Sequence, residues 1–163
     1  MEHRPPRPRV PRSSEVPALA RRVPNMRERT LTIFKPDSVA RHVCGSLVAR
    51  LEQEGFSILA VRSLRLGESQ AQTFYEVHRE RPFFRDLVRF MTEGPVWVLA
   101  LERDNAVDHL RRVMGATNPA EADKGTIRAE FGTSIERNAI HGSDSVDNAK
   151  RELAFFFSSG DLV

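Results

Sequence analysis

The order in which strand-like and helix-like segments follow one another constrains the fold of this chain more than any other feature. Four segments have the apolar alternation or β-branched composition of strands: 29–34, 56–66, 95–102 and 138–142. Segments with helical spacing of apolar residues lie between and after them: 45–55, 68–78, 81–94, 105–115 and a last helix that reaches 157. This order predicts an α+β fold with a ferredoxin-like βαββαβ core, in which a four-stranded antiparallel sheet carries helices on its faces.

Local signals set the expected boundaries. Pro36 and Asp37 predict a turn after the first strand. Residues 117–137 are rich in turn-forming residues and too long for a plain connector, so we expect an irregular segment there. Ser143 or Asp144 is expected to cap the last helix. The single cysteine, Cys44, cannot form an intrachain disulfide and is expected to pack rather than to react.

The N-terminal segment differs from the rest of the chain. Residues 1–26 hold six of the ten prolines and show no hydrophobic period, so we expect a disordered Arg/Pro-rich extension before a single domain over 27–163. Three origins stay open: a misassigned start with Met26 as the initiator, a genuine extension, or a transit peptide. The extension carries six Arg against two Glu, and the remainder 19 Lys and Arg against 20 Asp and Glu. The basic balance therefore belongs to the extension, which argues against a nucleic-acid-binding surface on the folded part.

Phosphate binding would have to use side chains and helix ends in this chain. Neither GxxxxGK[ST] nor GxGxxG occurs, so both common glycine-rich phosphate loops are excluded. Candidate phosphate ligands are Lys35, Arg81, Arg111 and Arg128, since guanidinium groups offer paired donors to phosphate oxygens. The alternative for any one of the 22 arginines is a solvated surface position.

A histidine stands among small polar residues in the motif NAIHGSDS at 138–145. His141 is expected between a strand and a helix whose first-turn amides can hold phosphate oxygens. Glu152 could bind one ring nitrogen and leave the other as a nucleophile, and Gly142 would leave room for a substrate. The alternative is a buried structural histidine, and the residues alone do not separate the two.

Two adjacent phenylalanines, Phe83 and Phe84, form the third feature. Neighbours on a helix cannot face the same way, so one can pack inward while the other is exposed. An exposed phenylalanine suits stacking on a nucleobase. The alternative is that both belong partly to the core.

Taken together, these residues resemble the nucleoside diphosphate kinase family over about residues 28–157. The resemblance rests on NAIHGSDS and on FKPDSV, FYEVHRERPFF, GATNPAEADKGTIRAEF and DNAKRELAFFF, in this family's order and spacing. It implies a ping-pong reaction in which ATP, carried with Mg²⁺, phosphorylates His141. ADP leaves, and the phosphohistidine then phosphorylates another nucleoside diphosphate, with little base or sugar selectivity. Maintenance of nucleoside triphosphate pools would be its role.

The resemblance also implies a role for each matching residue. Lys35 would meet the phosphates and the ribose 3′-hydroxyl, and Asn138 would bond the ribose. Phe83 would stack on the base, with Leu87 and Ile135 nearby. The β and γ phosphates would be held by Arg111, Thr117 and Arg128. Tyr75 would stand close to His141, which Ser143 and Glu152 would position. No metal ligand is expected from the protein, because no carboxylate pair that could hold a metal appears among these residues, and Mg²⁺ would arrive on the nucleotide.

Assembly and location follow from the same resemblance. A homo-oligomer is implied, with residues 117–133 contributing to assembly, and the short C-terminal segment favours a tetramer over a hexamer. The resemblance implies a cytoplasmic protein. No membrane span is expected, because no apolar run approaches the roughly 18–20 residues that cross a bilayer. Nucleic acid is not required. An RNA-binding module on this fold would need an RNP1-like run, which is absent, and a non-enzymatic relative would be expected to lose site residues that are intact here.

Overall fold

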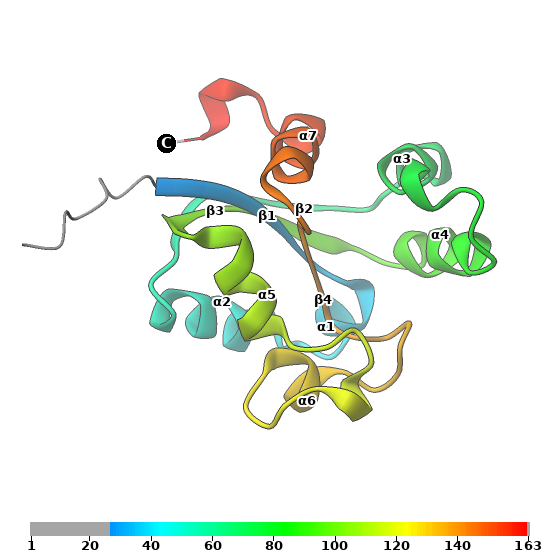
Figure 1. The fold of residues 1–163 in the computed structure, drawn as a ribbon. Coiled ribbons are helices and arrows are strands. Elements are labelled where there is room, and N and C mark those ends of the chain that lie inside the picture. The colour runs from blue at the N-terminus through cyan, green and yellow to red at the C-terminus, as the bar shows by residue number, and fades with distance from the viewer. Residues whose placement is uncertain (1–26, 163) are drawn as a thin grey trace, which may run out of the picture.

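The computed structural model describes residues 27–162, so the expected disorder of 1–26 lies outside the described residues. Four strands form one sheet: β1 Arg27–Phe34, β2 Ser57–Leu64, β3 Val96–Asp104 and β4 Ile140–Gly142. Their spatial order is β2-β3-β1-β4, and each neighbouring pair is antiparallel. The predicted α+β, ferredoxin-like arrangement is confirmed (Figure 1).

Seven helices surround this sheet in the described part of the chain: α1 Pro36–Ala40, α2 Cys44–Gln53, α3 Glu68–Phe74, α4 Phe84–Thr92, α5 Ala106–Met114, α6 Ile127–Phe131 and α7 Val146–Phe156. Short 3₁₀ turns lie at Glu76–His78, Pro119–Glu121 and Ser159–Asp161. Within residues 27–162, no helix has both the length and the apolar content needed to span a membrane.

Three local predictions were wrong. The expected turn after β1 is the short helix α1, which Pro36 opens at its first position, where proline's fixed φ suits a helix. The segment 117–137 is not irregular throughout, since it contains α6, and Thr126 caps that helix by accepting from the Ala129 N–H. Neither Ser143 nor Asp144 caps α7; the cap is Ser145, whose side chain accepts from the Asn148 N–H.

The sheet separates two hydrophobic cores. On one face, α3, α4 and α7 pack on β1 and β3 through residues such as Leu31, Phe74 and Leu153. On the other face lie α2, α5 and α6, and Figure 1 shows α7 on one side of the sheet and α2 and α5 on the other. Cys44 belongs to the second core, and burial raises the pKa of its thiol to about 11. The cysteine is therefore a packing residue, as predicted.

The side chains of the short strand β4 point alternately to the two faces of the sheet. Successive strand residues point to opposite sides, so Ile140 enters the second core while His141 faces the side of α3 and α7. His141 pairs with Ile33 of β1, and the Thr32 hydroxyl donates to the His141 carbonyl over 2.7 Å. An edge strand of three residues thus holds its histidine in a defined register.

Candidate active site

His141 binds a carboxylate that comes from a different element, α7. Its Nε2 makes a short hydrogen bond with Oε1 of Glu152, whose side chain is 4% exposed, whereas that of His141 is 21% exposed. Because a carboxylate only accepts, Nε2 carries the proton and the lone pair stands on Nδ1. Within residues 27–162, Nδ1 takes part in no hydrogen bond. The expected contact is present, and the ring keeps one nitrogen available.

A row of aromatic rings runs from His141 to Phe83. The Tyr75 ring meets His141 edge-on with centroids 6.1 Å apart, and His78 stacks beside Tyr75 at 6.4 Å. His78 in turn lies 5.5 Å from Phe83, and Phe74 packs edge-on against His141. His78 was not predicted from the sequence to belong to this row; the nearby aromatic residues Tyr75 and Phe83 were the available signal.

The Tyr75 hydroxyl is buried and has no hydrogen-bond partner among the described residues. Burial, and to a lesser extent the charge of Glu152, raises the pKa of Tyr75 well above its usual range. The phenol therefore keeps its proton. A buried O–H without a partner is costly, and an oxygen-rich ligand beside His141 would satisfy it.

Three of the predicted nucleotide contacts form one hydrogen-bonded chain. The ammonium of Lys35, just beyond β1, donates to Oδ1 of Asn138 over 2.7 Å, and Nδ2 of Asn138 donates to the Thr117 carbonyl over 3.1 Å. Lys35 is 7% exposed and Asn138 is 2% exposed. Residues distant in sequence are thus brought together immediately before His141.

Arg128, on α6, reaches the same segment from another direction. Its guanidinium donates to the Gly115 carbonyl over 3.0 Å and to the Ile140 carbonyl over 2.8 Å, while the buried Nε has no partner in the described structure. The second bond ties Arg128 to the residue before His141. The side chain therefore helps to fix β4 and keeps one N–H unused.

Burial and neighbouring positive charges lower the pKa values of the buried cations in this region. Burial first, and then the charge of Arg128, lowers the pKa of Lys35 to about 8, although Asp37 opposes the shift. Burial and the charge of Arg111 lower the pKa of Arg128 to about 10. Clustered, desolvated cations are stabilised by an anion, so this arrangement suits a negatively charged group.

Sequence reasoning placed Asp37 in a turn and did not give it a part in the site. Its Oδ2 accepts from the Ala139 N–H over 3.1 Å, and Ser38 donates to the Ala139 carbonyl over 2.8 Å. Ala139 has φ 72, a left-handed conformation that is costly for a residue with a Cβ. Asp37 and Ser38 therefore hold the bend between Asn138 and His141. The motif FKPDSV carried the signal, because these polar residues follow a buried strand.

Two residues beside His141 act differently from expectation. Ser143 makes no hydrogen bond to His141 or Glu152 in the described structure; its N–H and Oγ pair with the Leu31 backbone at 3.2 and 3.4 Å. Gly142 does not leave room for a substrate: an added Cβ would lie 2.8 Å from Sδ of Met114. The glycine instead permits close packing of α5.

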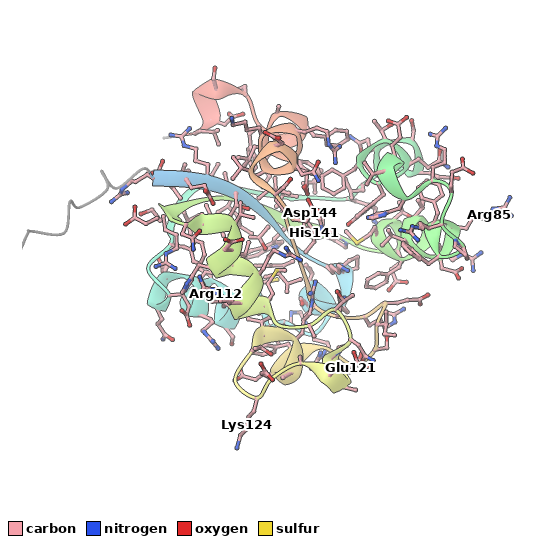
Figure 2. The ribbon with its side chains drawn as sticks, viewed as in Figure 1. Arg85, Arg112, Glu121, Lys124, His141 and Asp144 are labelled. Atoms are coloured by element: carbon pink, nitrogen blue, oxygen red, sulfur yellow. The ribbon has the colours of Figure 1, made fainter. Side chains whose placement is uncertain are left out.

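The remaining predicted residues stand at the periphery. Phe83 is 47% exposed and Ile135 is 59% exposed, while Leu87 is half-buried and packs on the first core. Phe84 is half-buried on the same core, so of the two alternatives the structure has the one with an inward and an outward phenylalanine. Arg111 and Thr117 are exposed. Figure 2 shows His141 near Asp144 and the start of α7, with Arg85 and Lys124 at the edge of the molecule.

A hollow lies elsewhere on the molecule. A cavity of about 550 Å³ is bounded by the start of β1, α7 and the residues after it, including Arg29, Leu153 and Phe157. None of the predicted site residues lines it. The reactive groups and this hollow are therefore in different places.

Comparison with known families gives a match to the family model described as nucleoside diphosphate kinase, over residues 28–162. A nucleoside diphosphate kinase of Nitratiruptor sp. is 54% identical over 136 residues, covering 83% of this chain and 99% of that protein. The one from Anaplasma phagocytophilum is 55% identical over 137 residues, covering 84% and 98%. These relatives match nearly all of the described chain.

Solved structures agree. The nucleoside diphosphate kinase of Aquifex aeolicus superimposes with a TM-score of 0.82 at 45% identity, covering 84% of this chain and 99% of that one. A halophilic nucleoside diphosphate kinase from Halobacterium salinarum, solved in complex with CDP, gives 0.80 at 40% identity, covering 83% and 91%. From its motifs, its fold and these matches, the chain belongs to the nucleoside diphosphate kinase family and is a phosphotransferase.

Proposed function

We propose that His141 is the phosphate carrier of a ping-pong transfer between a nucleoside triphosphate and a nucleoside diphosphate. The observation that most directly supports this proposal is the hydrogen bond between His141 Nε2 and Glu152. This bond occupies one ring nitrogen and leaves the lone pair on Nδ1 available. A merely structural histidine would not need the buried, unpartnered donors of Tyr75 and Arg128 in the same region.

In the first half-reaction, Nδ1 attacks the γ-phosphorus of ATP. A P–N bond forms, the bond between the γ-phosphorus and the bridging oxygen breaks, and ADP leaves with that electron pair. Glu152 stabilises the positive charge that the imidazole gains. In the second half-reaction, a β-phosphate oxygen of the acceptor forms a bond to the phosphorus, the P–N bond breaks, and its electron pair returns to Nδ1 and restores the neutral ring.

Transfer of a phosphoryl group depends on positioning and on positive charge at its oxygens. Lys35, Arg128 and Arg111 would supply that charge, with Thr117 and Tyr75 as hydroxyl donors. Asn138, held between Lys35 and Thr117, would face the ribose. Ser143 would position His141 through the backbone, by fastening the end of β4 to Leu31.

Mg²⁺ would enter with the nucleotide. The donor set fits this arrangement, because the buried carboxylates, Asp37 and Glu152, already accept hydrogen bonds from Ala139 and His141, and the other buried charged groups, Lys35 and Arg128, are cations. The phosphate oxygens would therefore be the metal ligands. When bound, the ion neutralises charge on the transferring phosphates.

The base would lie against Phe83, with Leu87 and Ile135 nearby. Apolar contacts carry no donor and acceptor pattern, which supports use of all bases. A homo-oligomer, with a tetramer favoured over a hexamer, and a cytoplasmic location remain predictions from the sequence.

Steady-state kinetics test the proposal. With ATP as donor and dTDP as acceptor, double-reciprocal plots at several fixed acceptor concentrations should give parallel lines. Exchange of label between ADP and ATP without any acceptor should also occur. Intersecting lines together with absent exchange would overturn the covalent route.

A further inference from the structure

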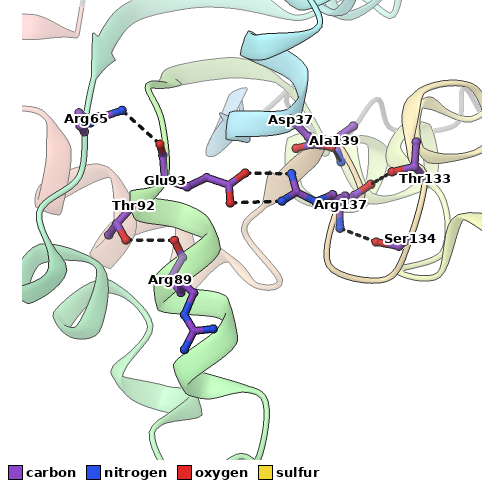
Figure 3. Close-up of polar contacts among 9 residues, drawn as sticks. All are labelled: Asp37, Arg65, Arg89, Thr92, Glu93, Thr133, Ser134, Arg137 and Ala139. Atoms are coloured by element: carbon purple, nitrogen blue, oxygen red, sulfur yellow. Dashed lines mark hydrogen bonds and ion pairs between the residues drawn. The ribbon is translucent and has the colours of Figure 1, made fainter.

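A bidentate salt bridge links two parts of the proposed base-binding region. Arg137 donates from Nη1 to Oε1 of Glu93 over 2.9 Å and from Nη2 to Oε2 over 3.2 Å. Its guanidinium also lies over the Phe90 ring, 4.9 Å from the centroid. Figure 3 shows the two parallel bonds between Arg137 and the end of α4.

Each partner is itself held in place. Glu93 is the C-cap of α4, and its carbonyl accepts from Arg65 over 3.1 Å. The carbonyl of Arg137 accepts from the Thr133 N–H over 2.8 Å, and its own N–H donates to the Ser134 hydroxyl over 3.0 Å. Arg137 thus closes the loop 133–137 on itself and fastens this loop to α4 (Figure 3).

The two linked segments both carry proposed nucleotide contacts. The helix α4 follows Phe83 and contains Leu87, whereas the loop contains Ile135 and leads directly into Asn138. Asn138 is fixed by Lys35 on the other side. The Arg137–Glu93 bridge therefore sets the separation between the helix and the ribose-binding segment.

The bridge is expected to contribute little to the stability of the protein. The Arg137 and Glu93 side chains are 48% and 40% exposed, and exposed ion pairs contribute little to the free energy of unfolding. A bidentate arginine–carboxylate pair instead fixes geometry. Arg137 is not one of the residues predicted from the sequence to contact the nucleotide.

We propose that Arg137 and Glu93 form a positioning clamp, which fixes the spacing of the base- and ribose-binding segments without touching the nucleotide. The clamp rests on the proposed function of this site. It predicts that loss of either partner weakens nucleotide binding while the phosphorylation of His141 at saturating ATP is unchanged.

The test uses Arg137→Ala, Glu93→Ala and the double variant, in full-length protein. ADP affinity is measured by calorimetry, and the phosphoenzyme formed at saturating ATP by intact mass. Each single variant should weaken ADP binding roughly ten- to a hundredfold, because small displacements of positioning groups have large effects. The double variant should lose no more than the single ones, since both break the same bridge.

Arg29→Ala is the matched control, because Arg29 pairs with Glu102 over 3.0 Å and is 45% exposed, but lies at the start of β1. Its ADP affinity should equal that of the wild type. Unchanged affinity in the Arg137 and Glu93 variants, multiplying losses in the double variant, or a reduced phosphoenzyme at saturation would each overturn the clamp. A wild type that forms no phosphoenzyme would instead reject the proposed function itself.

Discussion

Glu152 and His141 come from α7 and β4, and they meet through a hydrogen bond between Oε1 and Nε2 in a region where Glu152 is almost fully buried. The carboxylate fixes both the orientation of the imidazole and the position of its proton. The account of the reaction depends on this relationship, because it determines that Nδ1 is the nitrogen that can attack.

Replacing Glu152 by Gln tests this relationship. The amide oxygen can still accept from Nε2, but the negative charge that balances the phosphorylated ring is lost. Hydrogen bonds to charged groups contribute about 1.5–3 kcal/mol, so transfer should slow roughly 10- to 150-fold. ADP affinity should not change. Asp147→Asn, an exposed change on the same helix, is the control. A pure loss of affinity in Glu152→Gln would show that Glu152 serves the structure only.

Lys35 predicts a pH dependence of nucleotide capture. Its pKa is lowered to about 8, so its ammonium is charged below that pH and neutral above it. Because the charged form attracts phosphate, kcat/KM, which reports the free enzyme, should fall as the pH rises through about 8. The Lys35→Gln variant should have a lower kcat/KM, and its kcat/KM should not fall in this pH range. The same fall in Lys35→Gln would assign the titration to another group.

Phe83→Ala should weaken binding of every nucleotide to a similar degree. Its exposed ring offers one stacking surface, and base stacking on an aromatic residue is worth ~1–3 kcal/mol. KM measured for ADP, GDP, CDP and dTDP provides the comparison. Phe84→Leu, a change on the core side, should lower the melting temperature and leave the KM values alone. A Phe83→Ala effect confined to one base would contradict a site that does not select bases.

Gly115→Ala should disturb the site through packing. Gly115 has φ 84, and an added Cβ would lie 2.5 Å from the Thr126 hydroxyl, at the cap of the helix that carries Arg128. Gly125→Ala is the matched control, with φ 89 but no atom within 4 Å. Both should lower the melting temperature through backbone strain. Gly115→Ala should destabilise by a further ~1–3 kcal/mol and raise the KM for ATP. Equal melting temperatures would show that the contact with Thr126 is easily relieved.

The sequence predicted the sheet well because each strand has a distinct apolar pattern. Residues 29–34 and 95–102 correspond closely to β1 and β3. The short helices α1 and α6 could not be predicted, since five residues give less than two turns and show no period. Similarly, Ser143, Asp144 and Ser145 all suit a helix cap, and only the path of β4 determines that Ser145 serves.

The site was predicted in its residue types and less completely in its contacts. The spacing of His141 and Glu152 suggested their hydrogen bond, which the structure contains. The chain from Lys35 through Asn138 to Thr117 depends on how three distant segments pack, which the sequence does not specify. The roles of Asp37 and Arg137 were missed for the same reason. Asp37 binds a backbone N–H, and Arg137 binds Glu93 at the end of a helix distant in sequence.

The most direct test of the central claim is the intact mass of the protein after a brief incubation with Mg-ATP and no acceptor. The account predicts a gain of one phosphoryl group, lost in mild acid and absent from His141→Ala, which should keep its fold by circular dichroism. An unmodified mass for folded wild-type protein, or the same acid-labile adduct on His141→Ala, would contradict a phosphohistidine at His141.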